Sequence, residues 1–421
     1  MPTDTPSPSS PPSRTVAPGR HRLPFVVIMT TLALDAIGLG IVLPVLPDLL
    51  QEVSGSDLAH AALWGGVLTT SFAVMQFLCG PIVGNLSDRF GRRTVLIASL
   101  AVMTVDYLVM AVAGSIWLLL GARILAGMAA ANFATAAAYI ADISPPERKG
   151  SNFGLIGAAF GLGLIVGPAV GGLLGEFGTR LPFWVTAGIC AANMALAIFV
   201  LPETLSADRR RRFEWRRANP FGAFRSIGRL PGVRRILLLF FVYEFATFVY
   251  PATWAYFTAA RFGWPPGMIG LSLAIFGISF AVVQGGLIRV LHARIGNRAT
   301  VLFGLAMNAL AFTVLGLITD GFIALFLLPL SALGAVVAPT LQGIMSRIAE
   351  DNQQGELQGV IASAKAMAMI TSPLTMTSVF WLFTGPAAPV YLPGAAFLLS
   401  LGLMAICLWL FLGSRAAARV A

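Results

Sequence analysis

Ionisable side chains are scarce within the apolar runs of this sequence, and three of them have the types and spacing needed for proton chemistry. Asp35, Asp106 and Arg123 each interrupt a long run of apolar residues. A charge inside a bilayer costs about 2.5–3.5 kcal/mol on insertion scales, so a charge in such a run is a functional candidate. A carboxyl group that alternates between a desolvated site and a site beside a positive charge can bind and release a proton near neutral pH. These residues therefore predict a site that couples protons to another process.

The spacing of the three residues places them at one depth. Asp35 lies about 12 residues into the first apolar run and Asp106 about 13 residues into the third, so both lie roughly 18–20 Å from the same end of their helices. Arg123 follows the turn at Gly114 by nearly the number of residues by which Asp106 precedes it. An antiparallel hairpin then brings Asp106 and Arg123 together. The pair either couples protons or is a static structural contact, and Asp35 either couples protons or serves helix packing beside nearby glycines.

The elements that must hold these residues are membrane-spanning helices. The chain is 57% hydrophobic and 11% charged, and its mean hydropathy is +0.83. A spanning helix needs roughly 20 apolar residues, and helices satisfy the backbone groups that lipid cannot. We expect an all-α membrane protein with twelve spans, which begin near Pro24, Ala62, Thr94, Ile116, Ser151, Pro182, Ile236, Met268, Thr300, Phe322, Leu357 and Val390.

The net charge of +10 comes from arginines that concentrate on one side of this predicted topology. They precede the first span, follow the second, fourth and eighth spans, and fill the segment between Pro202 and Arg235. The positive-inside bias predicts that both termini are cytoplasmic. Basic charge is here an orientation signal, so we expect the lipid bilayer, and no nucleic acid, as the partner of this surface.

Two six-helix units are predicted from the hydrophilic segments and from an internal repeat. Shifting the chain by 205 residues aligns Gly91 with Gly296 and Arg93 with Arg298. Such parallel repeats hold a substrate site at their interface, which predicts two bundles around a central cavity. The expected parts are a disordered cytoplasmic tail at 1–22, a bundle at 23–202, an Arg-rich cytoplasmic linker at 203–235, a bundle at 236–413 and a cytoplasmic tail at 414–421.

Several motifs point to a known family. The loop Gly84-Asn-Leu-Ser-Asp88-Arg89-Phe-Gly91-Arg92-Arg93 resembles the signature between the second and third helices of the major facilitator superfamily. Gly163-x-x-x-Gly167-Pro168-x-x-Gly171-Gly172 resembles the fifth-helix signature of its drug/proton antiporters. Ala33-Leu34-Asp35-Ala36-Ile37-Gly38 and Leu357-Gln358-Gly359 are similar to segments of the bacterial tetracycline/proton antiporters.

The resemblance implies a function. A protein of this kind is expected to export a small amphipathic compound, tetracycline-like or another drug, in exchange for protons. It is expected in the bacterial inner membrane, without a cofactor or an obligate protein partner, driven by the proton gradient, and its substrate could arrive as a metal chelate. An acid at the position of Asp35 belongs to the family pattern, which favours a functional role for that residue.

The resemblance also implies which residues gate the two halves. The counterpart of Asp88 joins a charge cluster that latches the halves in the outward-facing state, so gating is expected of Gly84, Asp88, Arg89, Gly91 and Arg92. Orientation charge alone is the other interpretation. The second copy of the loop has Ala293 in place of the acid, so only the first copy can form an acidic latch.

The fifth helix carries the second set of gating candidates, Gly163, Gly167, Pro168 and Gly171. Glycines that recur every four residues form one smooth face that a partner helix can approach closely, and a proline in a helix bends it. This face either seals and slides between the two halves or packs ordinary neighbouring helices.

Substrate contacts are expected from Asp35, Glu244, Gln284 and Gln342. Glu244 and Lys365 lie at matched depth and could form a pair, with Lys365 interpreted as structural. The tetracycline-type proteins generally have an acid in the ninth helix, where this chain has Asn308. One proton-handling or cation-binding group is therefore missing, and the inherited proton stoichiometry does not transfer.

Other classes of protein fit the sequence less well. A proton-coupled uptake symporter for a metabolite would use the same carboxylates, and the glycine-proline signature argues for exchange instead. A membrane enzyme needs a nucleophile, a metal site or a phosphate loop, and no such motif is present, so we expect neither catalytic residues nor a metal site. A receptor that does not transport would leave Asp35 and Asp106 unexplained.

Overall fold

The computed structural model describes residues 22–130, 132–206, 208, 210–214, 219–222, 230 and 232–413. The predicted tails, apart from Arg22, and a large part of the predicted linker lie outside these residues. Every regular element among the described residues is helical. The expected all-α membrane fold is therefore confirmed.

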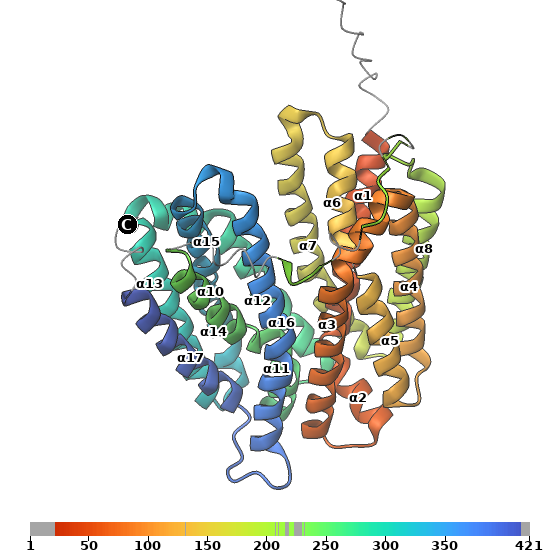
Figure 1. The fold of residues 1–421 in the computed structure, drawn as a ribbon. Helices are drawn as coiled ribbons and strands as arrows, with labels where there is room; N and C mark the ends of the chain where they lie inside the picture. The colour runs from red at the N-terminus through yellow and green to blue at the C-terminus, as the bar shows by residue number, and fades with distance from the viewer. Residues whose placement is uncertain are drawn as a thin grey trace, which may run out of the picture.

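The N-terminal half is a bundle of long helices, drawn in red to light green in Figure 1. Asp57 starts one of them by accepting the backbone N–H of His60 at 2.8 Å, which satisfies a donor that a helix start otherwise leaves unpaired. The elements are α1 (Arg22–Val42), α2 (Leu46–Ser54), α3 (Leu58–Phe90), α4 (Arg92–Val112), α5 (Ile116–Ala129), α6 (Asn132–Ile143), η1 (Pro146–Arg148), α7 (Lys149–Gly175) and α8 (Leu181–Val200).

The C-terminal half is a second bundle, drawn in green to blue in Figure 1. Several of its spans are interrupted, and the π-helical turn η4 contains Gly285 and Gly286. The elements are α10 (Arg234–Thr247), α11 (Val249–Phe262), α12 (Pro266–Val282), η4 (Val283–Leu287), α13 (Ile288–Leu317), α14 (Gly321–Ala332), η5 (Leu333–Val336), α15 (Val337–Ile348), η6 (Asp351–Gln353), α16 (Gln354–Thr384) and α17 (Ala395–Leu412).

Eleven helical stretches of the described chain are long and apolar enough to cross a membrane. One of them, Pro266–Leu317, contains 52 residues. A straight helix of that length would extend about 78 Å, far more than the hydrocarbon core of about 30 Å. Its backbone leaves the helical conformation at Gly296, with φ 74° and ψ 173°. The stretch therefore crosses twice, and the described chain makes the twelve crossings that were predicted.

The predicted start of the last span, near Val390, is wrong. The helix begins at Ala395, after a loop that contains Pro389 and Pro393. Proline lacks the N–H that a helix interior needs, and the loop is tied back by a bond from the N–H of Leu392 to the carbonyl of Phe383 at 2.9 Å. The other predicted starts lie within about one turn of a helix start or of the break at Gly296.

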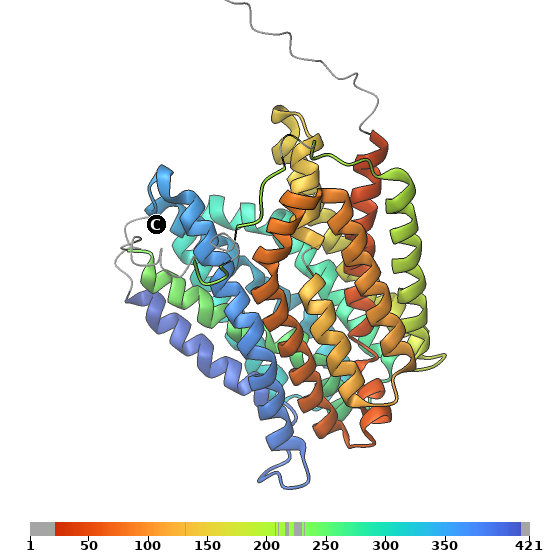
Figure 2. The ribbon, with the colours of Figure 1, turned by 45° about the vertical axis from the view of Figure 1, so that its right-hand side comes forward.

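The two bundles lie side by side and meet along two pairs of helices, α3 with α16 and α7 with α12 (Figures 1 and 2). We call the end that carries the loops at Gly91, Pro146 and Gly296 the basic end, and the end that carries the loops at Gly114 and Gly178 the far end. In Figure 1 the basic end is at the top. These four helices form the boundary between the halves.

Glycine contacts between the halves are tightest toward the far end. An added Cβ at Gly172 of α7 would lie 2.5 Å from the carbonyl oxygen of Pro266, and one at Gly66 would meet Thr377 of α16. Near the basic end, an added Cβ would meet no atom within 4 Å at the glycines of these helices and of the adjoining η4, namely Gly80, Gly84, Gly150, Gly154, Gly157, Gly161, Gly285, Gly286 and Gly355. In Figure 1 the two bundles also diverge toward the basic end.

Candidate functional site

The predicted ion pair between Asp106 and Arg123 is present in the N-terminal half. Arg123 on α5 donates from Nε to Oδ1 of Asp106 on α4 at 3.2 Å, and its Nη2 pairs with the second carboxylate oxygen. The guanidinium carbon also lies 5.6 Å from the ring centroid of Phe72. Asp106 is only 1% exposed. Such a pair holds two charges in the interior, where either charge alone would be strongly unfavourable.

Asp35 faces the interior of the same bundle. It is half-buried, and its carboxylate interacts electrostatically with the hydroxyl of Tyr107 on α4 and with the thiol of Cys190 on α8. One turn further along α1, Gly38 leaves room for Tyr107, because an added Cβ would lie 3.2 Å from the tyrosine oxygen. Asp35 is thus placed near the α4–α5 ion pair, on the side of α1 that faces α4 and α8.

Tyr107 links these predicted residues and was not itself predicted from the sequence. It follows Asp106 directly in α4, and the guanidinium carbon of Arg123 lies 5.9 Å from its ring centroid. The sequence feature that could have indicated it is its position, since Tyr107 directly follows an acid within a predicted span. The structure therefore brings Asp35, Asp106 and Arg123 around one tyrosine.

The predicted gating loop forms a charge cluster at the basic end. Asp88 pairs with Arg92 at 2.6 Å, and Nε of Arg92 lies 3.6 Å from Oδ2 of Asp142 at the end of α6. Arg89 is exposed and lies over the ring of Phe90, with its guanidinium carbon 5.1 Å from the centroid. All the ion pairs that the structure shows for Asp88 and Arg92 lie within the N-terminal half.

Glu203 completes this cluster and was not selected from the sequence. Its carboxylate accepts the backbone N–H groups of Arg92 at 2.9 Å and Arg93 at 3.2 Å, so it caps the start of α4. Gly91 adopts φ 104°, and an added Cβ there would lie against the Glu203 carboxylate. The acid comes just after the sixth span, and this position is the only sequence feature that could have indicated its role. Gly91 is thus required both by its backbone conformation and by the close carboxylate.

Two described pieces of the linker also attach to this loop. The amide of Asn85 donates to the carbonyl of Glu214 at 2.8 Å, and the N–H of Arg211 donates to the carbonyl of Asp88 at 3.1 Å. These bonds attach the linker, which joins the two halves, directly to the charge cluster.

The predicted glycine face of α7 lies against α1, inside the N-terminal half. An added Cβ would come within 2.6 Å of an α1 atom at each of Gly163, Gly167 and Gly171. Pro168 lies against Gly40 of α1 in the same way. In this conformation the three glycines pack against a helix of their own half, as one of the two interpretations expected. The contact with the other half is made by Gly172.

The contact between α7 and α12 at the far end has a polar component. Gly172 lies against Gly270, with an added Cβ only 2.9 Å from the Gly270 Cα. Glu176, which follows α7, accepts the backbone N–H of Gly267 in the first turn of α12 at 2.8 Å. A carboxylate at a helix N-terminus is favourable, because the unpaired N–H groups there carry partial positive charge. One acid of the N-terminal half thus caps a helix of the C-terminal half.

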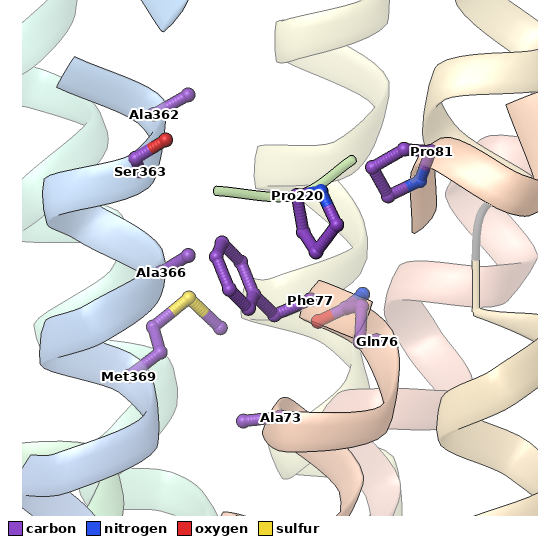
Figure 3. Close-up of a pocket in the computed structure, with 9 residues that line it drawn as sticks. All are labelled: Ala73, Gln76, Phe77, Pro81, Pro220, Ala362, Ser363, Ala366 and Met369. Carbon is purple, nitrogen blue, oxygen red and sulfur yellow. The ribbon is translucent and has the colours of Figure 1, made fainter. Parts of the chain in front are cut away.

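A cavity of about 300 Å³ lies between α3 and α16. Figure 3 shows the ring of Phe77 and the ring of Pro220 from the linker between these helices, with Met369 on the α16 side. Phe77 also packs edge-on against Phe221, with ring centroids 5.5 Å apart. The lining residues are Ala73, Gln76, Phe77, Pro81, Pro220, Ala362, Ser363, Ala366 and Met369.

The residues predicted to bind substrate lie elsewhere. Glu244 is half-buried in α10 and interacts electrostatically with Lys365 of α16, which is exposed. Gln284 lies in the π-helical turn and donates to the carbonyl of Ala335 at 3.3 Å, and Gln342 is half-buried in α15. None of the four candidates, Asp35 included, is among the residues that line the cavity at α3 and α16.

Comparison with known proteins places this geometry in a family. The Major Facilitator Superfamily model matches residues 28–373. The chain is 39% identical to the class C tetracycline resistance protein of Escherichia coli over 91% of this chain and 95% of that protein. It is 36% identical to the class G tetracycline resistance protein of Vibrio anguillarum, over 84% of this chain and 90% of that protein.

A solved structure agrees with the fold. The human organic anion transporter MFSD10 (TETRAN) matches with a TM-score of 0.67 and 26% identity, over 94% of this chain and 100% of that chain. The two bundles, the twelve crossings and the sequence matches agree. The chain is a multi-pass membrane transporter that belongs to the Major Facilitator Superfamily, with the tetracycline resistance proteins among its relatives.

Proposed function

We propose that this protein exports an amphipathic drug of the tetracycline type in exchange for protons. The observation that carries the proposal is the buried Asp106–Arg123 pair, with Asp35 in the same bundle, inside a chain that is 39% identical to a tetracycline resistance protein. Ionisable groups held away from water can change their protonation when the surrounding helices move. No cofactor or obligate protein partner is needed, because the proton gradient supplies the driving force.

The proposed cycle alternates access to the space between the halves. We place the basic end, and with it both termini, in the cytoplasm of a bacterial cell, because arginines concentrate there. The separation of the halves at that end and the glycine contacts at Gly172 and Gly66 then describe an inward-open state. Drug enters from the cytoplasmic side, and the halves rock so that the contact at the far end opens.

The cavity between α3 and α16 is the proposed first contact for the drug. Phe77 and Met369 offer flat and deformable apolar surface, and Gln76 and Ser363 supply polar groups nearby. An arrangement of this kind suits a planar amphipathic molecule, either free or as its metal chelate. Asp35 lies apart from this cavity, so in the proposal it handles protons and leaves drug contact to the cavity residues.

Inverted membrane vesicles test the exchange. With the vesicle interior acidified, the proposal predicts drug accumulation and drug-evoked proton release in the unmodified protein, and loss of both in Asp35→Asn. Glu147→Gln is the matched control, because Glu147 is an exposed acid at the basic end. Proton and drug movement in the same direction would instead identify an uptake symporter. Proton release that persists in Asp35→Asn would remove that residue from coupling.

A drug-resistance assay tests the cavity. Phe77→Ala should lower resistance to planar drugs by about fivefold, because loss of a stacking ring weakens binding by about 1 kcal/mol. Phe326→Ala is the control, since Phe326 is exposed on α14, away from the cavity. Equal losses in the two variants would contradict the proposed drug contact.

A further inference from the structure

The hydroxyl of Tyr107 has no hydrogen-bond partner among the described residues, although the side chain is buried. Buried polar groups in native proteins are nearly always paired, so an unpaired hydroxyl calls for an explanation. Here the hydroxyl lies against Gly38 of α1, one turn from Asp35, an acid that the proposed function uses. Its missing partner is therefore the first indication of a role.

The charged and titratable groups around Tyr107 come from four helices. Asp35 on α1 and Cys190 on α8 interact with it electrostatically, Asp106 precedes it on α4, and Arg123 on α5 lies over its ring with 5.9 Å from the guanidinium carbon to the centroid. Gly38 permits the hydroxyl to lie close to α1. A phenol can both donate and accept a hydrogen bond, so it can serve either protonation state of a neighbouring carboxyl group.

We propose that Tyr107 is a positioning residue that connects the Asp106–Arg123 pair to Asp35, an inference that rests on the proposed proton exchange. A hydrogen bond between Tyr107 and Asp35 is absent from the conformation described here. In the cycle that we propose, the hydroxyl donates to Asp35 when that carboxylate is ionised and accepts from Asp35 when the carboxyl group is protonated. The cation over the ring makes the phenol a stronger donor. When Asp106 takes up a proton, Arg123 loses its counter-ion, and its charge then favours the ionised form of Asp35 through Tyr107. Protonation of one acid thereby promotes release from the other.

The experiment is an infrared titration of the Asp35 carboxyl band in the full chain, reconstituted in lipid nanodiscs without drug. The band is identified as the one that Asp35→Asn removes. Tyr107→Phe keeps the ring over which Arg123 lies and removes only the hydroxyl. Because a donor favours the ionised carboxylate, its loss should move the titration midpoint toward alkaline pH by on the order of one unit.

Two further variants make the test selective. Tyr139→Phe is the matched control, since Tyr139 is a buried tyrosine of the same half whose hydroxyl donates to the carbonyl of Pro202 at 3.0 Å. It should leave the midpoint unchanged. Gly38→Ala should move the midpoint in the same direction as Tyr107→Phe but by less, because its methyl group would displace the hydroxyl without removing it. This variant also serves if Tyr107→Phe fails to fold.

An unchanged midpoint in both Tyr107→Phe and Gly38→Ala would overturn the inference, and so would an equal shift in Tyr139→Phe. The titration uses no drug and no gradient. Failure of drug-evoked proton release in vesicles would therefore refute the proposed exchange, while a shifted midpoint would still establish the link between Tyr107 and Asp35.

Discussion

In the N-terminal half the buried polar centre is ionised, with Asp106 paired to Arg123, whereas in the C-terminal half the buried polar centre is neutral. There Asn308 donates to the hydroxyl of Tyr243 at 3.4 Å, and that hydroxyl donates to the carbonyl of Gly334 at 2.8 Å. A neutral chain of this kind satisfies its groups without any proton to exchange. The two halves therefore share a fold but differ in the chemistry of their buried polar groups, an ion pair in one and neutral hydrogen bonds in the other.

The loops at the basic end show the same division. Gly91 and Gly296 both have positive φ, 104° and 74°, which an L side chain rarely adopts. The turn is thus common to both copies. The acid Asp88 pairs with Arg92 in the first copy, whereas the second copy has Ala293 at the matching position. Backbone geometry is common to both copies, and the acid is present in the first copy only.

The largest effect that would test this comparison is expected from Arg123→Gln. It leaves Asp106 buried without its partner, and breaking a buried pair in this way costs about 3–5 kcal/mol. Efflux should be lost, and denaturant unfolding of the purified protein should shift to much lower denaturant concentration. The double variant Asp106→Asn with Arg123→Gln should recover part of the lost stability, because no unpaired charge remains buried.

The contrasting measurement is made in the other half. Asn308→Ala removes a buried neutral group and should cost less than Arg123→Gln in the same unfolding assay. Equal losses would show that burial, and not charge, determines the sensitivity of the two centres.

A smaller effect is expected from Glu203→Ala. The carboxylate caps α4 through the N–H groups of Arg92 and Arg93, and loss of a cap costs about 1–2 kcal/mol. Thermal unfolding would measure the loss. Glu147→Ala, at an exposed acid of the same end, should change little, and a comparable loss there would argue against capping.

The neutral centre should respond weakly and without a pH dependence. Asn308→Leu removes the bond to Tyr243, and a typical net loss for one hydrogen bond is about 1 kcal/mol. We expect the pH profile of drug-evoked proton release to stay unchanged, because no titrating group is altered. A displaced profile would mean that the C-terminal half takes part in proton handling after all.

Much of this architecture could be predicted from the sequence, because local composition determines the spans, the loops and the charge bias. The Asp106–Arg123 pair followed from two distances along one hairpin. Glu203 and Tyr107 could not be found in that way, since their roles depend on which helices pack together. The glycine face of α7 was predictable as a close contact, but its partner, α1 in place of the other half, depends on helix rotation within the bundle.

The smallest effect is expected at Asp48 of α2, whose counterpart 205 residues later is the neutral Thr253. Burial, and secondarily the nearby Glu176, raises the pKa of Asp48 above its ordinary 3.8. A raised pKa means that ionised Asp48 disfavours the folded state, so the penalty is present at neutral pH and disappears as pH falls below 3.8. Asp48→Asn should therefore raise the unfolding temperature slightly at neutral pH and leave it unchanged in acid. Glu52→Gln should have the opposite sign at neutral pH, because Glu52 pairs with Arg180 at 2.9 Å. If Asp48→Asn raised the unfolding temperature equally at all pH values, the gain would come from packing and not from removal of a charge. Charge would then not distinguish the two halves at this end.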